Sequence, residues 1–308
     1  MSVVVLAYHE MGCMGLRTLL QRRVPIAAVY TYEDDPHENL WFGSVAKIAR
    51  DAGIPVSTTT DINDRDEVER VRRLAPDVLF SFYYRDMLKR PLREIPRLGG
   101  VNLHGSLLPK YRGRSPVNWQ LVHGERESGV TLHYMVARAD AGDIVGQERV
   151  AVGPDDTAIE LYRNLLPAAE RVLERNLDGI LAGTAPRLPQ DESQATVFGG
   201  RRPEDGRIDW NWPSKRIHDL VRAVAKPWPG AFSEVDGRRA MIWRTRLGAT
   251  LAGGARLQPG EVLLQSGRVL AGTGDAPIEL LEVELPAGAR LRSGDRFGTA
   301  RARSHDGN

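Results

Sequence analysis

The sequence predicts a two-domain protein with an α/β domain built on a parallel-rich sheet, followed by a small β-barrel domain. Three observations lead to this prediction. The 308 residues are enough for two domains of ordinary size. In the first half of the chain, short apolar runs alternate with helix-like stretches, which is typical of parallel strands joined by right-handed crossovers. Beyond Gly206 the chain instead alternates short strand-like runs with turn signals.

The first strand is expected at Val3–Ala7, a continuous apolar run of the kind found in buried parallel strands. The loop YHEMGCMG (8–15) follows, and its glycines are expected to permit a tight turn. A helix is expected from about Gly15 to Arg23, and a second strand at Ile26–Tyr30. These elements form one strand–helix–strand unit of a parallel sheet.

The next elements repeat this order. Ser44 is expected to cap a short helix, and a short strand follows at Ile54–Val56. Asn63 or Asp64 is expected to cap the charged helix DRDEVERVRRL (64–74), whose apolar residues recur at three-residue steps. Further strands are expected at Val78–Phe82, Gly100–His104 and Gly129–Met135.

The pattern changes in the second half of the chain. A long helix is expected over Thr157–Leu181, before a stretch marked by Pro and Gly at 183–189. Asp236-Gly237 is a strong hairpin signal. The strands of the second domain are expected within three segments, 231–243, 259–274 and 276–286.

Composition and charge exclude several classes of protein. Lys plus Arg (42) against Asp plus Glu (40) gives a net charge of +2, so no strong field attracts nucleic acid or an anionic membrane. The single cysteine, Cys13, excludes a disulfide framework. The start MSVVVLAYHE has no basic region, and its apolar run is too short for a signal peptide or a membrane span. A soluble cytoplasmic protein without stable membrane insertion is therefore expected.

The run VNLHGSLLPKYRGRSPVNWQ (101–120) contains the candidate chemistry. On a strand, Asn102 and His104 would point to one face, about 7 Å apart, at the carboxyl edge of the sheet. His can move a proton near neutral pH, and an Asn amide can donate a hydrogen bond to a developing oxyanion, an effect worth roughly 3 kcal/mol. Asp140 is the best candidate to orient His104, because the strand Gly129–Met135 before it is expected to end at the same edge. Without a nearby Ser or Cys nucleophile, these residues predict direct acyl transfer to an amine.

A structural role for the same residues stays open on the pattern alone. A lone His on a strand is more often a satisfied structural residue. Asn102 can bond a turn, and Asp140-Ala141-Gly142 is also a turn signal.

The loop after the first strand suggests two other ligands, and neither is expected. HEMGCMG lacks the spacing G-x-G-x-x-G, so NAD binding is not predicted. His9, Glu10 and Cys13 match no known metal-ligand spacing, so no metal is expected.

The run NLHGSLLPKYRGRSPVNW closely resembles the signature of 10-formyltetrahydrofolate-dependent formyltransferases, which contain N-x-H, S-L-L-P, R-G-x-x-P and a downstream D-x-G. The resemblance extends to EDGRIDW, PWPGAF and the turns PGEV and TGD, and so covers nearly the whole chain. It implies a Rossmann-like formyltransferase domain followed by an OB-like domain. The expected bounds are 1–188 for the catalytic domain, 189–203 for a linker, 204–300 for the OB-like domain and 301–308 for a tail.

A narrower resemblance concerns the substrate. LAYHEMGCMG, FGSVAKIA and DVLFSFYYR are similar to the ArnA-type formyltransferases, one half of a bifunctional protein of lipid A modification and polymyxin resistance. That half formylates the 4-amino group of UDP-4-amino-4-deoxy-L-arabinose. The resemblance implies the same substrate for a stand-alone chain, and leaves room for a separate decarboxylating dehydrogenase as a partner. The resemblance does not indicate the oligomeric state.

The resemblance also implies roles for individual residues. His104 would donate or accept a proton, Asn102 would stabilise the tetrahedral intermediate, and Asp140 would raise the basicity of His104. The ArnA-type pattern has a His and two aliphatic residues where this chain has Asp86, Met87 and Leu88, so the backbone is the expected contact there. The folate (10-formyltetrahydrofolate) contacts are expected at Asp86, Met87, Leu88, Arg114, Val136, Ala137, Arg138, Ala139 and Asp140.

Different acceptors and contacts stay open at this point. Methionyl-tRNA formyltransferases share Asn102, His104 and Asp140. Their loop after the second strand is long and basic, whereas the corresponding stretch here, TYEDDPHENLWFG (31–43), is acidic. The acceptor could also be another nucleotide-linked amino sugar, or water in a formyltetrahydrofolate hydrolase. Tyr83 and Tyr84 could stack on a pterin or a uracil as well as form a strand end. Candidate phosphate contacts are Arg85, Arg112 and Arg201.

Overall fold

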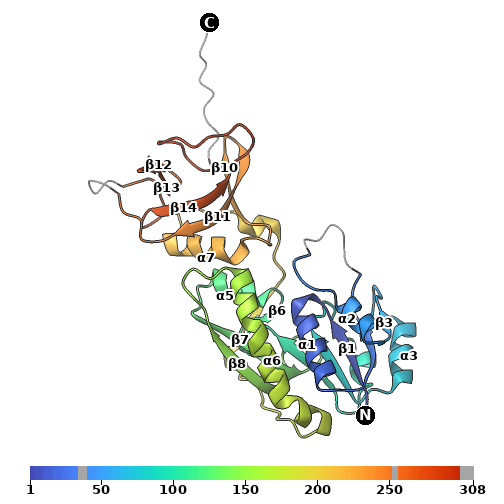
Figure 1. Cartoon of the computed structure of the whole chain (residues 1–308). Helices are drawn as coiled ribbons and strands as arrows, with labels where there is room; N and C mark the ends of the chain where they lie inside the picture. Colours follow the sequence, from blue (N-terminus) through green and yellow to red (C-terminus); the bar gives the residue numbers. More distant parts are fainter. Residues whose placement is uncertain (34–39, 252–255, 299–308) are drawn as a thin grey trace. The chain divides into compact units, whose positions relative to one another are not determined.

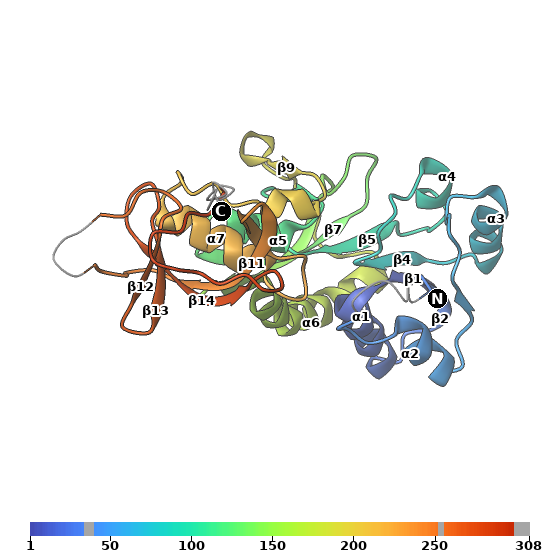
Figure 2. The same cartoon turned by 90° about the horizontal axis from the view of Figure 1, so that it is seen from above.

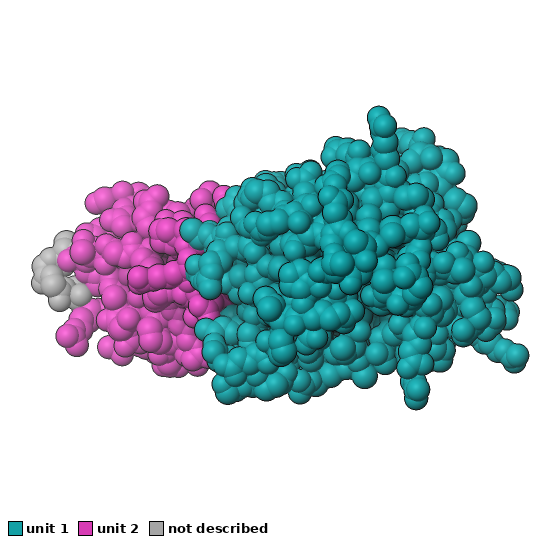
Figure 3. Space-filling view, turned by 90° about the horizontal axis from the view of Figure 1, so that it is seen from below, with its two compact units in different colours: residues 1–116, 127–151, 162–199 teal, residues 117–126, 152–161, 200–308 magenta. Residues whose placement is uncertain are grey.

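The computed structural model describes residues 1–33, 40–251 and 256–298. The chain divides into two compact units (Figure 3). Unit 1 comprises residues 1–116, 127–151 and 162–199, and unit 2 comprises 117–126, 152–161 and 200–308. The predicted tail (301–308) and residues 34–39 of the acidic stretch 31–43 lie outside the described residues. The domain bounds expected from the sequence stay a prediction, because the units exchange short segments along the chain.

Unit 1 is built on a mixed sheet with the strand order β3-β2-β1-β4-β5-β7-β8 (Figure 1). The strands from β3 to β5 are parallel, which confirms the predicted parallel-rich sheet. The strands are β1 (Val3–Ala7), β2 (Ile26–Tyr30), β3 (Val56–Ser57), β4 (Val78–Phe82), β5 (Gly100–His104), β7 (Glu127–Tyr134) and β8 (Ile144–Ala151).

Strand β7 runs antiparallel to β5, contrary to the expectation from the sequence. Val101 pairs with Tyr134 and His104 with Thr131, so β7 ends beside the beginning of β5. The segment between the two strands is short and contains helix α5 (Pro116–Val122), and it returns the chain to the same edge from which β5 leaves. Strand β8 then pairs antiparallel with β7 as a hairpin partner.

Helices cover both faces of the sheet (Figure 2). Helices α3 (Arg65–Leu74) and α4 (Arg90–Arg93) pack on one face, and α1 (His9–Gln21) and α2 (Val45–Asp51) contact each other on the other. The predicted caps are present, because Ser44 accepts a hydrogen bond from the Lys47 N–H and Asp64 from the Asp66 N–H. The core beneath α3 and α4 is formed by Val4, Leu6, Ala28, Tyr30, Ile62, Val68, Val71, Leu79, Leu88 and Leu92.

Helix α1 begins at His9, so most of the segment expected to be a loop is helical. Its glycines serve close packing instead of a tight turn. A Cβ on Gly12 would lie 3.1 Å from Ala7, and one on Gly15 would lie 2.5 Å from the Phe82 ring. The missing side chains therefore allow the helix to pack directly against β1 and β4.

Unit 1 also contains most of a long helix and a short pair of strands. Helix α6 (Ala158–Ala182) matches the predicted long helix to within a residue at each end. Strand β6 (Arg112–Gly113) pairs in parallel with β9 (Val197–Phe198), far along the chain. A single 3-10 turn at Glu192–Gln194 precedes β9.

Unit 2 contains an antiparallel sheet with the order β10-β11-β14-β13-β12, consistent with the predicted OB-like domain. Asp236 and Gly237 form the predicted hairpin turn, and both have positive φ angles of 51° and 71°. The elements are η2 (Pro203–Gly206), α7 (Ser214–Val224), β10 (Ala231–Val235), β11 (Arg238–Arg246), β12 (Val262–Gln265), β13 (Arg268–Ala271) and β14 (Ile278–Glu284).

None of the helices in the described ranges could span a membrane. Each falls short of the length and apolar character that crossing a bilayer requires.

Candidate functional site

Asn102 and His104 lie on one face of β5, as the alternation of a strand predicts. Val101 and Leu103, which alternate with them along the strand, are buried on the other face. The pairing of β5 with its neighbour places Ser81 of β4 beside Asn102. The polar face of β5 is therefore continuous with that of β4.

Asp140 contacts both residues from the loop after β7. Its Oδ1 accepts a hydrogen bond from Asn102 Nδ2 at 3.4 Å, and its Oδ2 lies 3.6 Å from His104 Nδ1. The backbone N–H of Gly113 donates to the same Oδ2 at 2.8 Å. The structure thus brings the three predicted catalytic residues together.

The strand direction that led to Asp140 was predicted wrongly, although Asp140 does lie beside His104. Strand β7 ends at the opposite edge from β5. The loop that follows folds back over the face of the sheet, and Asp140 adopts a left-handed conformation (φ 51°) that Asp tolerates better than most residues. Asp140 therefore contacts the middle of the face.

Gln190 and Arg112 hold the Asp140 loop in place. Gln190 Nε2 donates to the carbonyl oxygens of Asp140 and Gly142, at 2.7 Å each. Gln190 Oε1 accepts from Arg112 Nη2 at 2.7 Å, and Arg112 also pairs with Glu192 at 2.8 Å. Arg112 is 1% exposed, so its guanidinium is engaged within the protein instead of facing a ligand phosphate.

Asp140 remains ionised in this setting. Burial opposes the charge, but the charge of His104, the hydrogen bond and charge of His133 and the Gly113 N–H outweigh it. Together they hold the pKa of Asp140 well below its usual range. Asp140 thus supplies a fixed negative charge beside two imidazole rings.

A lowered pKa predicts how Asp140 contributes to stability. The ionised carboxylate stabilises the folded state above its unfolded pKa, near 3.9, and this contribution is lost as the pH falls through the folded pKa. We expect the stability lost on Asp140→Asn to persist down to about pH 4 and to shrink below it. Urea unfolding of both proteins across this range checks the sign. A difference that already falls steadily between pH 7 and pH 5 would contradict it.

Both ring nitrogens of His104 face protein groups. Nε2 lies 2.8 Å from the carbonyl oxygen of Tyr111, which can only accept, so Nε2 carries a proton. Nδ1 lies 3.6 Å from Asp140. The His104 side chain is 7% exposed. For His104 to exchange a proton with a substrate, one of these two contacts must open.

His133 is a member of the site that sequence reasoning missed. It lies directly opposite Asn102 in the β5–β7 pair and therefore on the same face. Its Nε2 lies 3.0 Å from Asn102 Nδ2 and 3.3 Å from Asp140 Oδ1. The signal was available: alternation along β7 puts His133 on one face, and a pairing of β7 with β5 would have placed it beside Asn102.

The protonation of His133 determines which partner it favours. Nδ1 lies 3.0 Å from the Tyr134 carbonyl oxygen and therefore carries a proton. In the neutral ring, Nε2 accepts a hydrogen bond and matches the Asn102 amide. In the charged ring, Nε2–H donates and matches Asp140. His133 is thus placed to set the direction in which the Asn102 amide points.

This placement predicts a positioning role for His133. We expect His133→Leu to lower kcat about tenfold, the equivalent of one hydrogen bond to a charged network, with KM unchanged. The pH dependence of kcat should change as well. His133→Gln keeps an amide group at the same reach and should restore part of the rate. A loss of stability with an unchanged kcat and pH profile would show that His133 only packs the sheet.

Some of the residues expected to contact folate lie near the face of β5 that contains Asn102 and His104. Segment 86–88 follows β4, which ends at the same edge as β5. Asp86 receives a hydrogen bond from the Tyr32 hydroxyl at 2.9 Å, and the Met87 carbonyl one from Asn63 at 3.0 Å. Leu88 is buried in the core, whereas Met87 is 54% exposed.

The other predicted folate residues lie after β6 and β7. Arg114 is exposed, and its backbone N–H donates to the Phe198 carbonyl at 2.9 Å. Arg138 pairs with Glu192 at 2.5 Å. Val136 and Ala137 are exposed, and Ala139 is half-buried next to Asp140. Their folate contacts stay a prediction.

The aromatic residues at the strand ends contact other rings. Tyr84 stacks on Tyr32 with ring centroids 4.7 Å apart, and Tyr83 meets Tyr162 edge-on at 5.7 Å. The Arg85 guanidinium lies 4.5 Å from the centre of the Tyr8 ring. Arg201, a further candidate for phosphate contact, belongs to unit 2 and lies over the Trp119 ring at 4.6 Å.

Potential metal ligands do not gather in the part of the chain that the structure describes. His, Cys, Asp and Glu side chains form no group of three or more there that could hold an ion.

Asn102, His104 and Asp140 lie together on one face of the sheet, an arrangement suited to acid–base chemistry in a group-transfer enzyme. Comparison with known families is more specific. Residues 2–177 match the model described as formyl transferase, and residues 201–299 match the formyl transferase C-terminal domain. The chain belongs to the formyl transferase family and is a formyltransferase.

Solved structures share the whole fold. The sugar 3N-formyl transferase WlaRD, solved in the presence of dTDP and 5-N-formyl-THF, is 21% identical, with a TM-score of 0.70 over 91% of this chain and 97% of its own. An N-formyltransferase from Helicobacter canadensis, in complex with folinic acid and dTDP-3-aminofucose, is 21% identical, with a TM-score of 0.70 over 90% and 98%. A sugar N-formyltransferase from a Shewanella species is 17% identical, with a TM-score of 0.62 over 82% and 99%. At these identities the likeness establishes the fold.

Proposed function

We propose that the protein transfers a formyl group from 10-formyltetrahydrofolate to the 4-amino group of UDP-4-amino-4-deoxy-L-arabinose. The observation on which the proposal rests is the contact of Asp140 with both Asn102 and His104 on one face of the sheet. This arrangement offers an amide donor, an imidazole and a fixed negative charge, and formyl transfer to an amine uses all three.

In the proposed reaction the sugar amine attacks the formyl carbon, and the carbonyl electrons move to oxygen. Asn102 would donate a hydrogen bond to that oxyanion, assisted by the protonated ring of His104. The C–N bond to folate then breaks, the folate nitrogen takes up a proton, and the former amine loses one. His104 would move this proton after its contact with Tyr111 or Asp140 opens. Asp140 would keep the ring oriented.

The solved relatives support the two substrates. The WlaRD and Helicobacter canadensis structures contain a formyl-folate compound together with dTDP or a dTDP-amino sugar. The proximity of segment 86–88 to the trio along neighbouring strands supports a folate beside the catalytic face in the proposal. The proposal takes a nucleotide-linked amino sugar as the acceptor class and the uridine-linked arabinose as its particular member.

The particular sugar is supported by stretches outside the trio. HEMGCMG and YYR directly follow β1 and β4, which end side by side at one edge. His9 and Tyr83, at or next to those ends, have positive φ angles of 62° and 56°. Such conformations in non-Gly residues cluster at binding sites. The stretches that resemble the ArnA-type enzymes are therefore located where open α/β sheets bind their ligands.

Methionyl-tRNA is the rival acceptor, and the charge disfavours it. A tRNA acceptor needs a basic surface, but the net charge is +2 and the stretch 31–43 is acidic. The described part of this stretch includes Glu33, which accepts a hydrogen bond from Thr58 at 2.6 Å.

A competition experiment tests the acceptor. With 10-formyltetrahydrofolate limiting and both acceptors present, we expect formyl transfer to the UDP-amino sugar and none above background to methionyl-tRNA. A dTDP-4-amino sugar serves as the control for the nucleotide. Faster formylation of methionyl-tRNA would overturn the substrate proposal, and a preference for the dTDP sugar would change only the nucleotide.

A further inference from the structure

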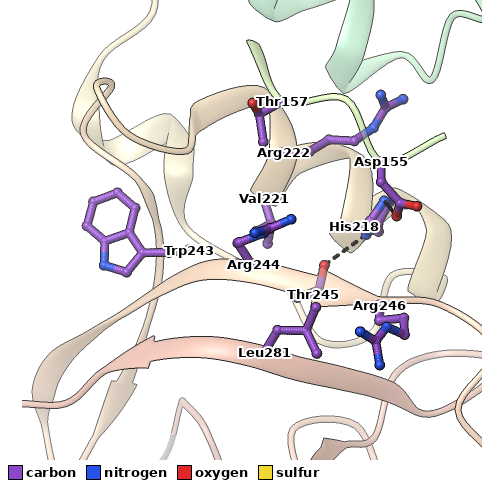
Figure 4. A pocket seen from close by; sticks show the side chains of 10 residues that line it. All are labelled: Asp155, Thr157, His218, Val221, Arg222, Trp243, Arg244, Thr245, Arg246 and Leu281. Carbon is purple, nitrogen blue, oxygen red and sulfur yellow. Dashed lines mark hydrogen bonds and ion pairs between the residues drawn. The ribbon is translucent and has the colours of Figure 1, made fainter. Parts of the chain in front are cut away.

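Unit 2 contains a cavity of about 140 Å³ that formyl transfer, as proposed above, does not use (Figure 4). Helix α7 contributes one wall, strand β11 another, and the segment around Asp155 and Thr157 a third. All of its lining residues belong to unit 2, whereas Asn102, His104 and Asp140 belong to unit 1. The polar lining includes Asp155, His218, Arg222, Arg244, Thr245 and Arg246.

Two irregularities in the sheet form the β11 wall. The pairing of β11 with β14 shifts register between Ile242 and Arg244 and again between Arg244 and Thr245. In a regular strand, neighbouring side chains alternate between faces. Here the four consecutive residues 243–246 all line the cavity. Bulges of this kind re-aim side chains and are over-represented next to functional sites.

Few carboxylates within the described residues neutralise the charges of Arg244 and Arg246. Within the described residues, Arg244 forms no ion pair with a carboxylate, and Arg246 has one long contact with Glu279, at 3.5 Å. Glu279 is already held by Arg268 at 3.0 and 2.8 Å. Two guanidinium groups thus border the cavity with most of their donors available.

The other charged groups of the wall are satisfied. Arg222 pairs with Asp219 at 2.9 Å, both with side chains 6% exposed. His218 is fixed between the Thr245 hydroxyl at 2.9 Å and the Pro154 carbonyl at 3.2 Å. Asp155 opposes a negative ligand, but its carboxylate is 74% exposed and can remain in water. The net charge of the side chains that line the cavity is therefore positive.

We propose that this cavity binds a small phosphate-bearing anion through the guanidinium groups of Arg244 and Arg246. Guanidinium forks match phosphate oxygens in pairs, and such charge-assisted bonds are the strong ones. Arg244 and Arg246 stand two residues apart on β11 and both line the cavity, and Trp243 beside them is anchored by a hydrogen bond to Glu284 at 3.0 Å. The phosphate could belong to a nucleotide or be free in solution.

Calorimetric titration of the full chain with inorganic phosphate tests the proposal. The Arg244→Ala/Arg246→Ala double variant should weaken binding at least about tenfold, the loss expected for charge-assisted hydrogen bonds. Arg238→Ala/Arg239→Ala is the matched control, since it removes two exposed arginines from the same strand outside the cavity. It should retain the affinity to within about twofold, because neither side chain lines the cavity and their charges act on it only through screened solvent.

Each outcome decides for or against the site. No binding to the wild-type chain, an unchanged affinity in the Arg244/Arg246 variant, or an equal loss in the control would each overturn the proposal. A second titration with UMP identifies the source of the phosphate. A parallel loss for UMP in the Arg244/Arg246 variant assigns the site to nucleotide phosphates, and a loss for inorganic phosphate alone assigns it to the free ion. Formyl transfer should be retained in this variant, so the result is independent of the proposed function.

Discussion

Replacing either Asn102 or His104 with Ala is expected to lower the turnover number by about 100-fold or more. In the proposed reaction Asn102 would donate a hydrogen bond to the oxyanion, and His104 would move the proton. The Asp140 carboxylate contacts both side chains. The single substitutions should not be additive, because the residues act on one developing charge.

The measurement is steady-state formylation with both substrates varied. Asn176→Ala and His123→Ala are suitable controls, because they remove the same side chains from α6 and from the exposed position directly after α5. Circular dichroism and thermal unfolding establish that each variant is folded. Turnover near that of the wild type in a folded Asn102 or His104 variant would remove that residue from the mechanism.

The second large effect is expected for Gly142→Ala. A Cβ at Gly142 would overlap the carbonyl oxygen of Tyr134, so the backbone of the loop must move. The adjacent Asp143 carbonyl accepts the Tyr134 N–H at 2.9 Å, and Gln190 holds the Gly142 carbonyl at 2.7 Å. We expect a loss of about 3 kcal/mol or more in the free energy of unfolding, together with a loss of activity from the displacement of Asp140.

Gly199→Ala is the matched control for this substitution. A Cβ there meets no atom within 4 Å, and the residue belongs to the same unit. Urea unfolding should therefore leave this variant within about 0.5 kcal/mol of the wild type. Equal stability of the Gly142 and Gly199 variants would show that the D-x-G turn tolerates a side chain. The close approach of Gly142 to β7 would then have no role in positioning Asp140.

The sequence predicted most strands of unit 1 because a buried strand has a local signature. Val3–Ala7, Ile26–Tyr30, Val78–Phe82 and Gly100–His104 match the structure at both ends. The direction of β7 could not be predicted in this way, since alternation along a strand is the same in either direction. Asp140 was therefore chosen for a wrong reason, and the loop that delivers it became visible only in three dimensions.

The residues that were missed or misjudged depend on contacts between distant segments. His133 becomes part of the site through the register of β5 with β7. Arg112 was a candidate for phosphate contact, but Gln190 and Glu192, nearly 80 residues away in the chain, enclose its guanidinium. The start of α1 was placed too late because Gly12 and Gly15 suggested a turn, whereas they provide close packing.

Mass spectrometry of the acceptor tests the central claim most directly. The purified chain is incubated with 10-formyltetrahydrofolate and a panel of nucleotide-linked 4-amino sugars that includes UDP-4-amino-4-deoxy-L-arabinose, with the Asn102→Ala variant as the blank. We expect the uridine-linked arabinose to gain the mass of one CO group, with tetrahydrofolate released in equal amount and about a hundredth of the product or less in the blank. Tetrahydrofolate release with free formate and no formylated sugar would contradict the claim, because water would then be the acceptor.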